Sequence, residues 1–195
     1  MQFLSFIIPT IIQLYIIILI LRIWMQWVKS DFYNPFVQFV IKSTQPIIGR
    51  VNHFIPSIRS IDTASLLVAY IITLSNILFI MWATNSLSLI SITLLPISII
   101  QLFNYIGKLI FWLILIRSLL TWINQGNHPI DYMLIELTEP LIIPIRRMIP
   151  PFFGLDFSSM IIILILIALN YLRLDILLFL DEKLTNTLYS MGYLM

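Results

Sequence analysis

The sequence predicts an all-α membrane protein with four transmembrane helices, arranged as two tandem units of helix, amphipathic helix and helix. Of its 195 residues, 60% are hydrophobic and only 10% are charged, and the mean hydropathy is +1.01. Soluble domains average about 45–50% apolar and about 25% charged residues. A soluble fold of this size could not hide so much apolar surface. Long apolar segments and an internal repeat then define the architecture.

The repeat is clearest between residues 44–56 and residues 138–150. One threonine and two prolines recur at an offset of 94 residues, together with five apolar positions. An acidic residue follows each copy at the same offset, as Asp62 and Asp156. A fixed-period repeat outweighs any single motif in predicting a fold. The chain should therefore contain one structural unit twice.

The four spans are expected at residues 4–28, 63–83, 100–123 and 158–180. Each is mainly apolar and reaches the roughly 20 residues that a helix needs to cross a hydrocarbon core. The first lacks a basic start and a small-residue cleavage site, so a cleaved signal peptide is not expected. Residues 85–99 should form a connection, and a short polar tail should follow the last span.

Between its two prolines, each copy of the repeat carries apolar residues at the spacing of one helical face. A helix of about nine residues rises only about 13 Å, too little to cross a membrane. It should instead lie in the membrane interface. The units 1–84 and 100–195 then hold two spans each and point the same way, which predicts a pseudo-two-fold axis along the membrane normal.

Basic residues predict the orientation. They concentrate in the two repeat loops, whereas the opposite side offers mainly Arg173 and Lys183. The positive-inside rule places the loops in the cytoplasm and both termini outside. The basic residues of the loops are Lys29, Lys42, Arg50, Arg59, Arg146 and Arg147.

An Arg-x4-Trp pair closes the first span of each unit, at Arg22 and Arg117, and a Thr-Gln/Glu-Pro sequence follows each. The second unit continues with Pro-x-Arg-Arg at residues 144–147, where the first departs from this pattern. This constellation covers nearly the whole chain and resembles the YggT family of bacterial and plastid membrane proteins. The resemblance implies a bacterial plasma-membrane protein. Relatives are implicated in haem attachment to a plastid cytochrome, in nucleoid and septum organisation, and in osmotic tolerance.

Arg22 and Arg117 are candidate functional residues because each lies inside the predicted end of a span, where a charge is costly. Snorkelling to the headgroups, with a tryptophan in the interface, is the simpler interpretation. A sharper hypothesis is that each arginine hydrogen-bonds into its own loop, Arg22 to Gln45 and Arg117 to Glu139.

Asp62 and Asp156 precede apolar runs and are expected to cap the helices that follow. An acidic pair on an ion path is the alternative interpretation. Arg146 and Arg147 form a basic pair on a short interfacial helix. Anionic headgroups are their expected ligands, with a cytoplasmic partner protein as the alternative.

The sequence offers no catalytic, metal or cofactor site. It has no cysteine, which excludes thiolate zinc sites and cysteine nucleophiles. Its two histidines, His53 and His128, are not equivalent in the repeat and fall in polar segments, so haem ligation is not expected. Phosphate-loop, zinc-protease and serine-nucleophile motifs are missing from the sequence. The net charge of +2, without a basic run, gives no indication of nucleic-acid binding.

We therefore expect a non-enzymatic assembly or organising factor for other membrane or division components. A small transport-related or accessory protein in ion or osmotic balance is the alternative. The lipid bilayer and its anionic headgroups are the expected partners, and the sequence leaves open other membrane proteins and a homo-oligomer.

The loop hypothesis makes a first prediction. Replacing Arg117→Leu removes a donor that orders the loop and should destabilise the fold, whereas Glu139→Gln keeps an acceptor oxygen and should cost little. Thermal unfolding of the purified protein in detergent compares the two variants. Equal tolerance of both substitutions contradicts the hypothesis.

Overall fold

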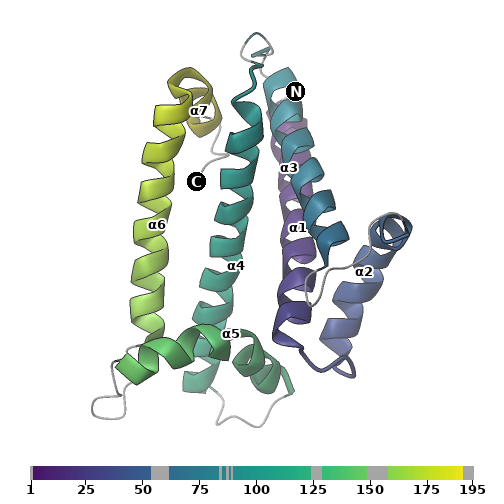
Figure 1. Ribbon diagram of the computed structural model, residues 1–195, viewed down its shortest axis with the longest axis vertical. Coiled ribbons are helices and arrows are strands. Elements are labelled where there is room, and N and C mark those ends of the chain that lie inside the picture. The colour runs from purple at the N-terminus through teal and green to yellow at the C-terminus, as the bar shows by residue number, and fades with distance from the viewer. Residues whose placement is uncertain are drawn as a thin grey trace.

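The structure, a computed structural model, describes residues 2–53, 62–83, 85–86, 88, 90–123, 129–148 and 158–190. Within these residues the chain forms helices without strands. Figure 1 shows long helices that run along the longest axis of the molecule, with shorter helices at both ends. The helices are α1 (Gln2–Val28), α2 (Pro35–Val51), α3 (Thr63–Ala83), α4 (Leu94–Ile123), α5 (Pro129–Met148), α6 (Ser158–Leu180) and α7 (Glu182–Ser190).

Four of these helices are long and apolar enough to cross a membrane, which confirms the predicted fold class. Their spanning segments are Phe6–Val28, Thr63–Ala83, Leu94–Leu120 and Ser158–Leu180. The third begins six residues before the expected position, within the predicted connection. Pro96 is the third residue of α4, and a proline costs little there because the first turn of a helix has no acceptors for its N–H groups.

The predicted interfacial helix of the first unit is longer than expected and starts twelve residues earlier, at Pro35 instead of residue 47. Asn34 is its N-cap and accepts a hydrogen bond from the Phe36 N–H at 2.9 Å. Pro46 lies inside the helix and does not bound it. A proline inside a helix removes one backbone hydrogen bond and crowds the carbonyl four residues earlier, a cost that burial of one face of α2 offsets. The expected end of this helix, at residue 55, lies outside the described residues.

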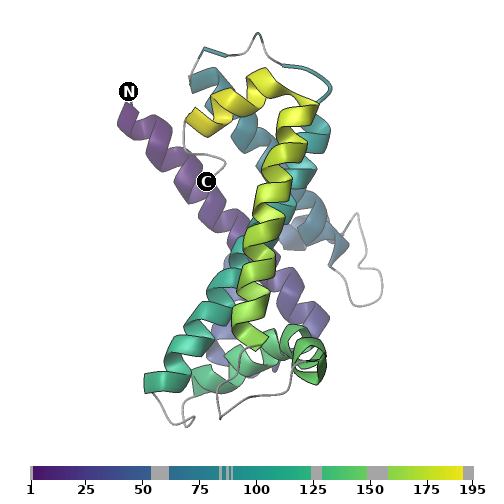
Figure 2. The same ribbon diagram turned by 90° about the vertical axis from the view of Figure 1, so that its left-hand side faces the viewer.

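The second interfacial helix, α5, likewise runs through its prolines, Pro140 and Pro144. Figure 1 places α2 and α5 at the same end of the molecule, where α1 and α4 finish. The start of α1 and the short helix α7 lie at the opposite end. Figure 2 shows α6 in front, with α5 beneath it and α4 behind.

Packing follows the duplication. Helix α1 packs on α3 and α4 packs on α6, while α4 also contacts α1 and α3 and so joins the two units. Ala64 and Ala69 on α3 are fully buried beside α1, as expected where small residues let membrane helices approach. The Trp24 indole N–H of α1 donates to the Leu137 carbonyl of α5 at 2.9 Å. This bond ties the interfacial helix of the second unit to the first.

The polar tail that the sequence predicts after the last span begins with the helix α7. Its Leu184 and Leu188 are buried in a cluster with residues of α3, α4 and α6. Asp181 precedes α7 and accepts from the Leu184 N–H at 3.0 Å and from the Thr93 hydroxyl at 3.1 Å. The tail thus closes the end of the bundle opposite α2 and α5.

Candidate functional site

Arg22 lies in the last two turns of α1 and joins three elements. Its Nε donates to Asp62 Oδ2 at 3.0 Å, forming an ion pair. Its Nη1 donates to Thr44 Oγ1 at 2.7 Å and to Gln45 Oε1 at 3.3 Å, both on α2. The arginine and aspartate side chains are 12% and 3% exposed. A single guanidinium therefore fixes the end of α1 to α2 and to the start of α3.

Asp62 is both the ion-pair partner and the cap of α3. Its Oδ1 accepts from the Ser65 N–H at 3.0 Å, and its Oδ2 accepts from the Ser65 hydroxyl at 2.7 Å. A carboxylate at this position satisfies a backbone donor and complements the positive end of the helix. Asp62 therefore has the hydrogen bonds of a helix cap, and its negative charge is also paired with Arg22.

Thr44, on α2, orients the guanidinium of Arg22. It is fully buried, accepts from Arg22 and donates its own hydroxyl hydrogen toward the Val40 carbonyl at 2.8 Å. Because the hydroxyl is held on the backbone of α2, its lone pair faces the guanidinium. The repeat includes this threonine, but Thr44 is not among the site residues predicted from the sequence.

The second unit repeats this contact. Arg117 Nη1 on α4 donates to Thr138 Oγ1 on α5 at 2.6 Å, and the Thr138 hydroxyl contacts the Leu134 carbonyl at 2.6 Å. Thr138 is 1% exposed. The sequence predicted a hydrogen bond from Arg117 to Glu139, the residue that follows Thr138. Glu139 is half-buried, and this hydrogen bond stays a prediction. Asp156, the counterpart of Asp62, lies outside the described residues.

The remaining described candidates lie at the C-terminal ends of the two interfacial helices. Arg146 and Arg147 occupy the last turn of α5, where cations complement the negative end of a helix. Arg147 is exposed and Arg146 is half-buried. His53 is exposed just after α2, and His128 falls outside the described residues.

Among the described residues, the arginine networks hold helices together through hydrogen bonds and one ion pair. In the part of the chain that the structure describes, no three His, Asp or Glu side chains gather closely enough to bind a metal. The Asp62 carboxylate is occupied by Arg22 and Ser65. Thr44 and Ser65 could have been found from the sequence, because a hydroxyl side chain stands at each of these two positions in both units.

Comparison with known proteins identifies relatives along nearly the full chain. The CCB3/YggT family model matches residues 1–83 and 96–177. "Uncharacterized protein YggT" of Escherichia coli (strain K12) is 48% identical over 170 residues, covering 87% of this chain and 88% of that protein. "Uncharacterized protein in proC 3'region" of Vibrio alginolyticus is 44% identical over 177 residues, covering 90% and 96%. No solved structure matches the chain.

The Arg22–Asp62 pair yields a prediction about stability. Asp62→Asn should destabilise the protein by about 3–5 kcal/mol, because removing one partner leaves the other charge buried. Gln45→Ala is the matched control. It removes an exposed acceptor of the same arginine and should cost less than about 1 kcal/mol. Denaturant or thermal unfolding in detergent measures both values.

A double-mutant cycle separates pairing from local damage. Arg22→Gln combined with Asp62→Asn should be less destabilising than the sum of the two single substitutions, because neither charge is then left alone. Additive effects would show that the two side chains act independently and that the ion pair does not hold the helices.

Proposed function

The chain belongs to the CCB3/YggT family, and we propose that it is a non-enzymatic organising factor in the bacterial plasma membrane. In this proposal α2 and α5 form two platforms on the cytoplasmic face, where they recruit other membrane or division components. The observation that carries the proposal is the use of partly buried arginines to fix these two helices. Arg22 binds α2, and Arg117 binds α5.

Rigid attachment matters for a platform. An interfacial helix that lies only on lipid can rotate and diffuse, whereas α2 and α5 are hydrogen-bonded to spans. Preorganised surfaces lose less conformational entropy when they bind. The polar chemistry of the two arginine networks therefore supports positioning more than it supports catalysis.

The surfaces of these helices also suit the membrane interface. They expose aromatic and aliphatic side chains beside basic residues, the composition of helices that lie at a headgroup boundary. Each basic residue near an anionic surface contributes roughly 1 kcal/mol of attraction. The exposed apolar and basic side chains include Phe36, Phe39, Lys42, Ile47 and Arg50 on α2, and Ile130, Tyr132, Ile143, Arg147 and Met148 on α5.

Cross-linking tests the platform. Intact cells expressing the full chain are treated with a membrane-permeable cross-linker, and adducts are purified from membranes. Wild type should retain a specific protein partner that Arg146→Ala/Arg147→Ala loses, because the basic pair forms the polar end of α5 and its Arg147 is exposed. Lys183→Ala, a basic residue at the opposite end, is the control and should retain the partner.

Recovery of the same partners with and without Arg146 and Arg147 contradicts this platform. If no specific partner is found and deletion causes osmotic sensitivity, the result favours the alternative role in ion or osmotic balance.

Reporter fusions test the orientation that the proposal requires. Alkaline phosphatase is active only outside the cytoplasm. A fusion after Asn52, behind α2, should be inactive, and one after Ser190, behind α7, should be active, because the basic residues near α2 and α5 favour the cytoplasm. Green fluorescent protein at the same positions provides the complementary control. The reverse pattern would place the platforms outside and contradict the proposal.

A further inference from the structure

A cavity of about 550 Å³ lies between α4 and α6, away from the arginine networks. Its wall is mostly apolar, and several lining side chains are strongly exposed at the surface of the molecule, among them Phe103, Leu169 and Leu172. All three lie within spanning segments, so the cavity opens toward the hydrocarbon of the bilayer. Its volume is within the range of about 300–1,000 Å³ that is typical of small-molecule sites.

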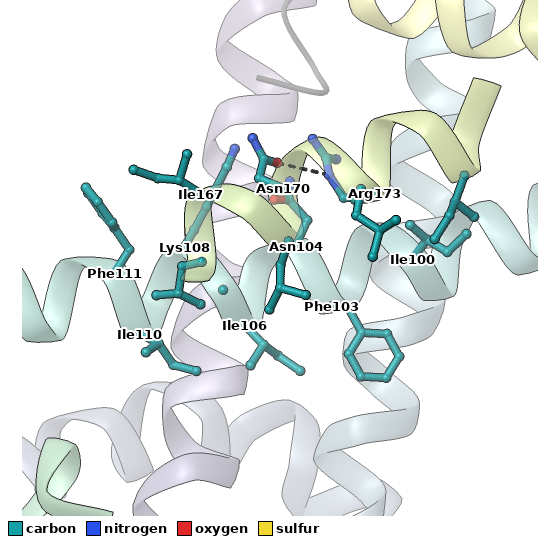
Figure 3. A pocket seen from close by; sticks show the side chains of 15 residues that line it. Ile100, Phe103, Asn104, Ile106, Lys108, Ile110, Phe111, Ile167, Asn170 and Arg173 are labelled. Atoms are coloured by element: carbon teal, nitrogen blue, oxygen red, sulfur yellow. Dashed lines mark hydrogen bonds between the residues drawn. The ribbon is translucent and has the colours of Figure 1, made fainter. Parts of the chain in front are cut away.

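Four polar side chains lie in this otherwise apolar wall: Asn104, Lys108, Asn170 and Arg173. Figure 3 shows Lys108, Asn170 and Arg173 reaching toward the same end of the cavity. Arg173 Nε donates to Asn170 Oδ1 at 3.1 Å, and its Nη1 donates to Gln101 Oε1 at 2.9 Å. Among the described residues that line the cavity, there is no carboxylate.

Asn104 supplies an independent indication of a ligand. It is 9% exposed, and its amide nitrogen Nδ2 is buried with no hydrogen-bond partner among the described residues. A buried N–H group without an acceptor costs about 1–3 kcal/mol, and such a group calls for an explanation. A rotation of the Asn104 side chain toward the cavity would bring this nitrogen to an acceptor atom of a bound ligand, which would satisfy it.

The depth of the two cations in the bilayer also favours a site. Arg173 lies seven residues before the end of α6, which is about 10 Å at 1.5 Å per residue. Lys108 lies near the middle of the third spanning segment, Leu94–Leu120. Charged residues at such depth are costly and tend to mark binding or transport functions.

The duplication shows that these groups are not required by the fold. At the offset that relates α3 to α6, Asn170 corresponds to Asn76, and Arg173 corresponds to Phe79. At the offset that relates α1 to α4, Lys108 corresponds to Gln13. The first unit therefore builds the same helix pair without either cation.

We propose that this cavity binds an amphiphilic anion, a carboxylate or phosphate carried on a hydrocarbon chain. The anionic head would accept hydrogen bonds from Lys108 and from the amide groups beside Arg173, including Asn104 Nδ2. The chain would lie along the apolar wall near Gly107 and Leu166. A cation is a poor fit, because the polar end presents ammonium, guanidinium and amide N–H donors.

Binding to the full-length protein in a non-ionic detergent tests the site. The probes are oleate and dioleoyl phosphatidic acid, which separate a free carboxylate from a lipid phosphate, with methyl oleate as the uncharged control. Wild type should bind at least one anionic probe saturably and methyl oleate at least about tenfold more weakly, as expected from losing one charge-assisted hydrogen bond.

Lys108→Gln/Arg173→Gln should weaken binding of the preferred anion by about tenfold or more. Lys29→Gln/Lys42→Gln removes the same charge from exposed positions and should bind as wild type does. A double variant that fails to fold would be recognised by its unfolding profile, and the substitution at Gly107 then decides the outcome.

Gly107→Leu fills the cavity without touching either cation. A Cβ at this position would lie 4.0 Å from Leu166 Cδ2, an ordinary contact. The helix therefore tolerates a side chain there, and the remaining atoms of the leucine would occupy the cavity. This variant should lose the anionic probe, and Gly107→Ala should keep most binding. Unchanged binding by both the Gly107→Leu and the charge variants would overturn the proposal, as would saturable binding of neither anion.

A photo-reactive amino acid in place of Phe103 identifies the occupant in native membranes. A lipid-sized adduct supports the proposal, whereas a protein adduct would show that a partner helix fills the cavity and would overturn it. The cavity is separate from Arg146 and Arg147, so this site and the cytoplasmic platform can fail independently.

Discussion

The ion pair between Arg22 and Asp62 is the interaction on which the first unit depends. A charge inside a span is costly unless it is paired, and here the partner is the residue that begins the next span. The same guanidinium reaches Thr44 on the intervening helix. One buried charge thereby specifies the position of three consecutive elements, and the second unit repeats its contact to the interfacial helix through Arg117 and Thr138. Helix packing in a membrane has little hydrophobic driving force, so such polar contacts contribute strongly to specificity.

The positions of the spans could be predicted from the sequence because hydropathy and length are local properties. The duplication could be predicted because it needs only a fixed offset. The extent of α2 could not, because Pro46 looks like a helix boundary in isolation and only the buried face beneath it, with Val40 and Ile48, shows that the helix continues. The hydrogen bond from Arg22 to Gln45 was predicted, but the ion-pair partner of Arg22 was missed for a different reason. Asp62 is 40 residues away, and its role as a cap already explained it locally.

The two units share one arrangement of helices but differ in the side chains that these helices carry. The shared features include the arginine at the end of the first span and the threonine of the interfacial helix, which occupy equivalent positions in both units. The side chains differ where the second helix pair carries Lys108 and Arg173 in place of Gln13 and Phe79. Half of the residues in the most apolar window of α3 are buried, against 17% in that of α6. Duplication thus left one pair closely packed and the other open to the bilayer.

That difference decides where binding energy is available. A closely packed helix pair has already used most of its apolar surface within the fold. In the α4–α6 pair, an apolar wall remains uncovered beside a buried amide nitrogen, Asn104 Nδ2, that no described residue satisfies. A ligand that supplies both hydrocarbon and an acceptor would gain contacts with the wall and remove the cost of the unsatisfied donor at once. A purely polar anion would only satisfy the donor, and an uncharged lipid tail would only gain contacts with the wall. The chemistry of this wall therefore favours an amphiphile over either.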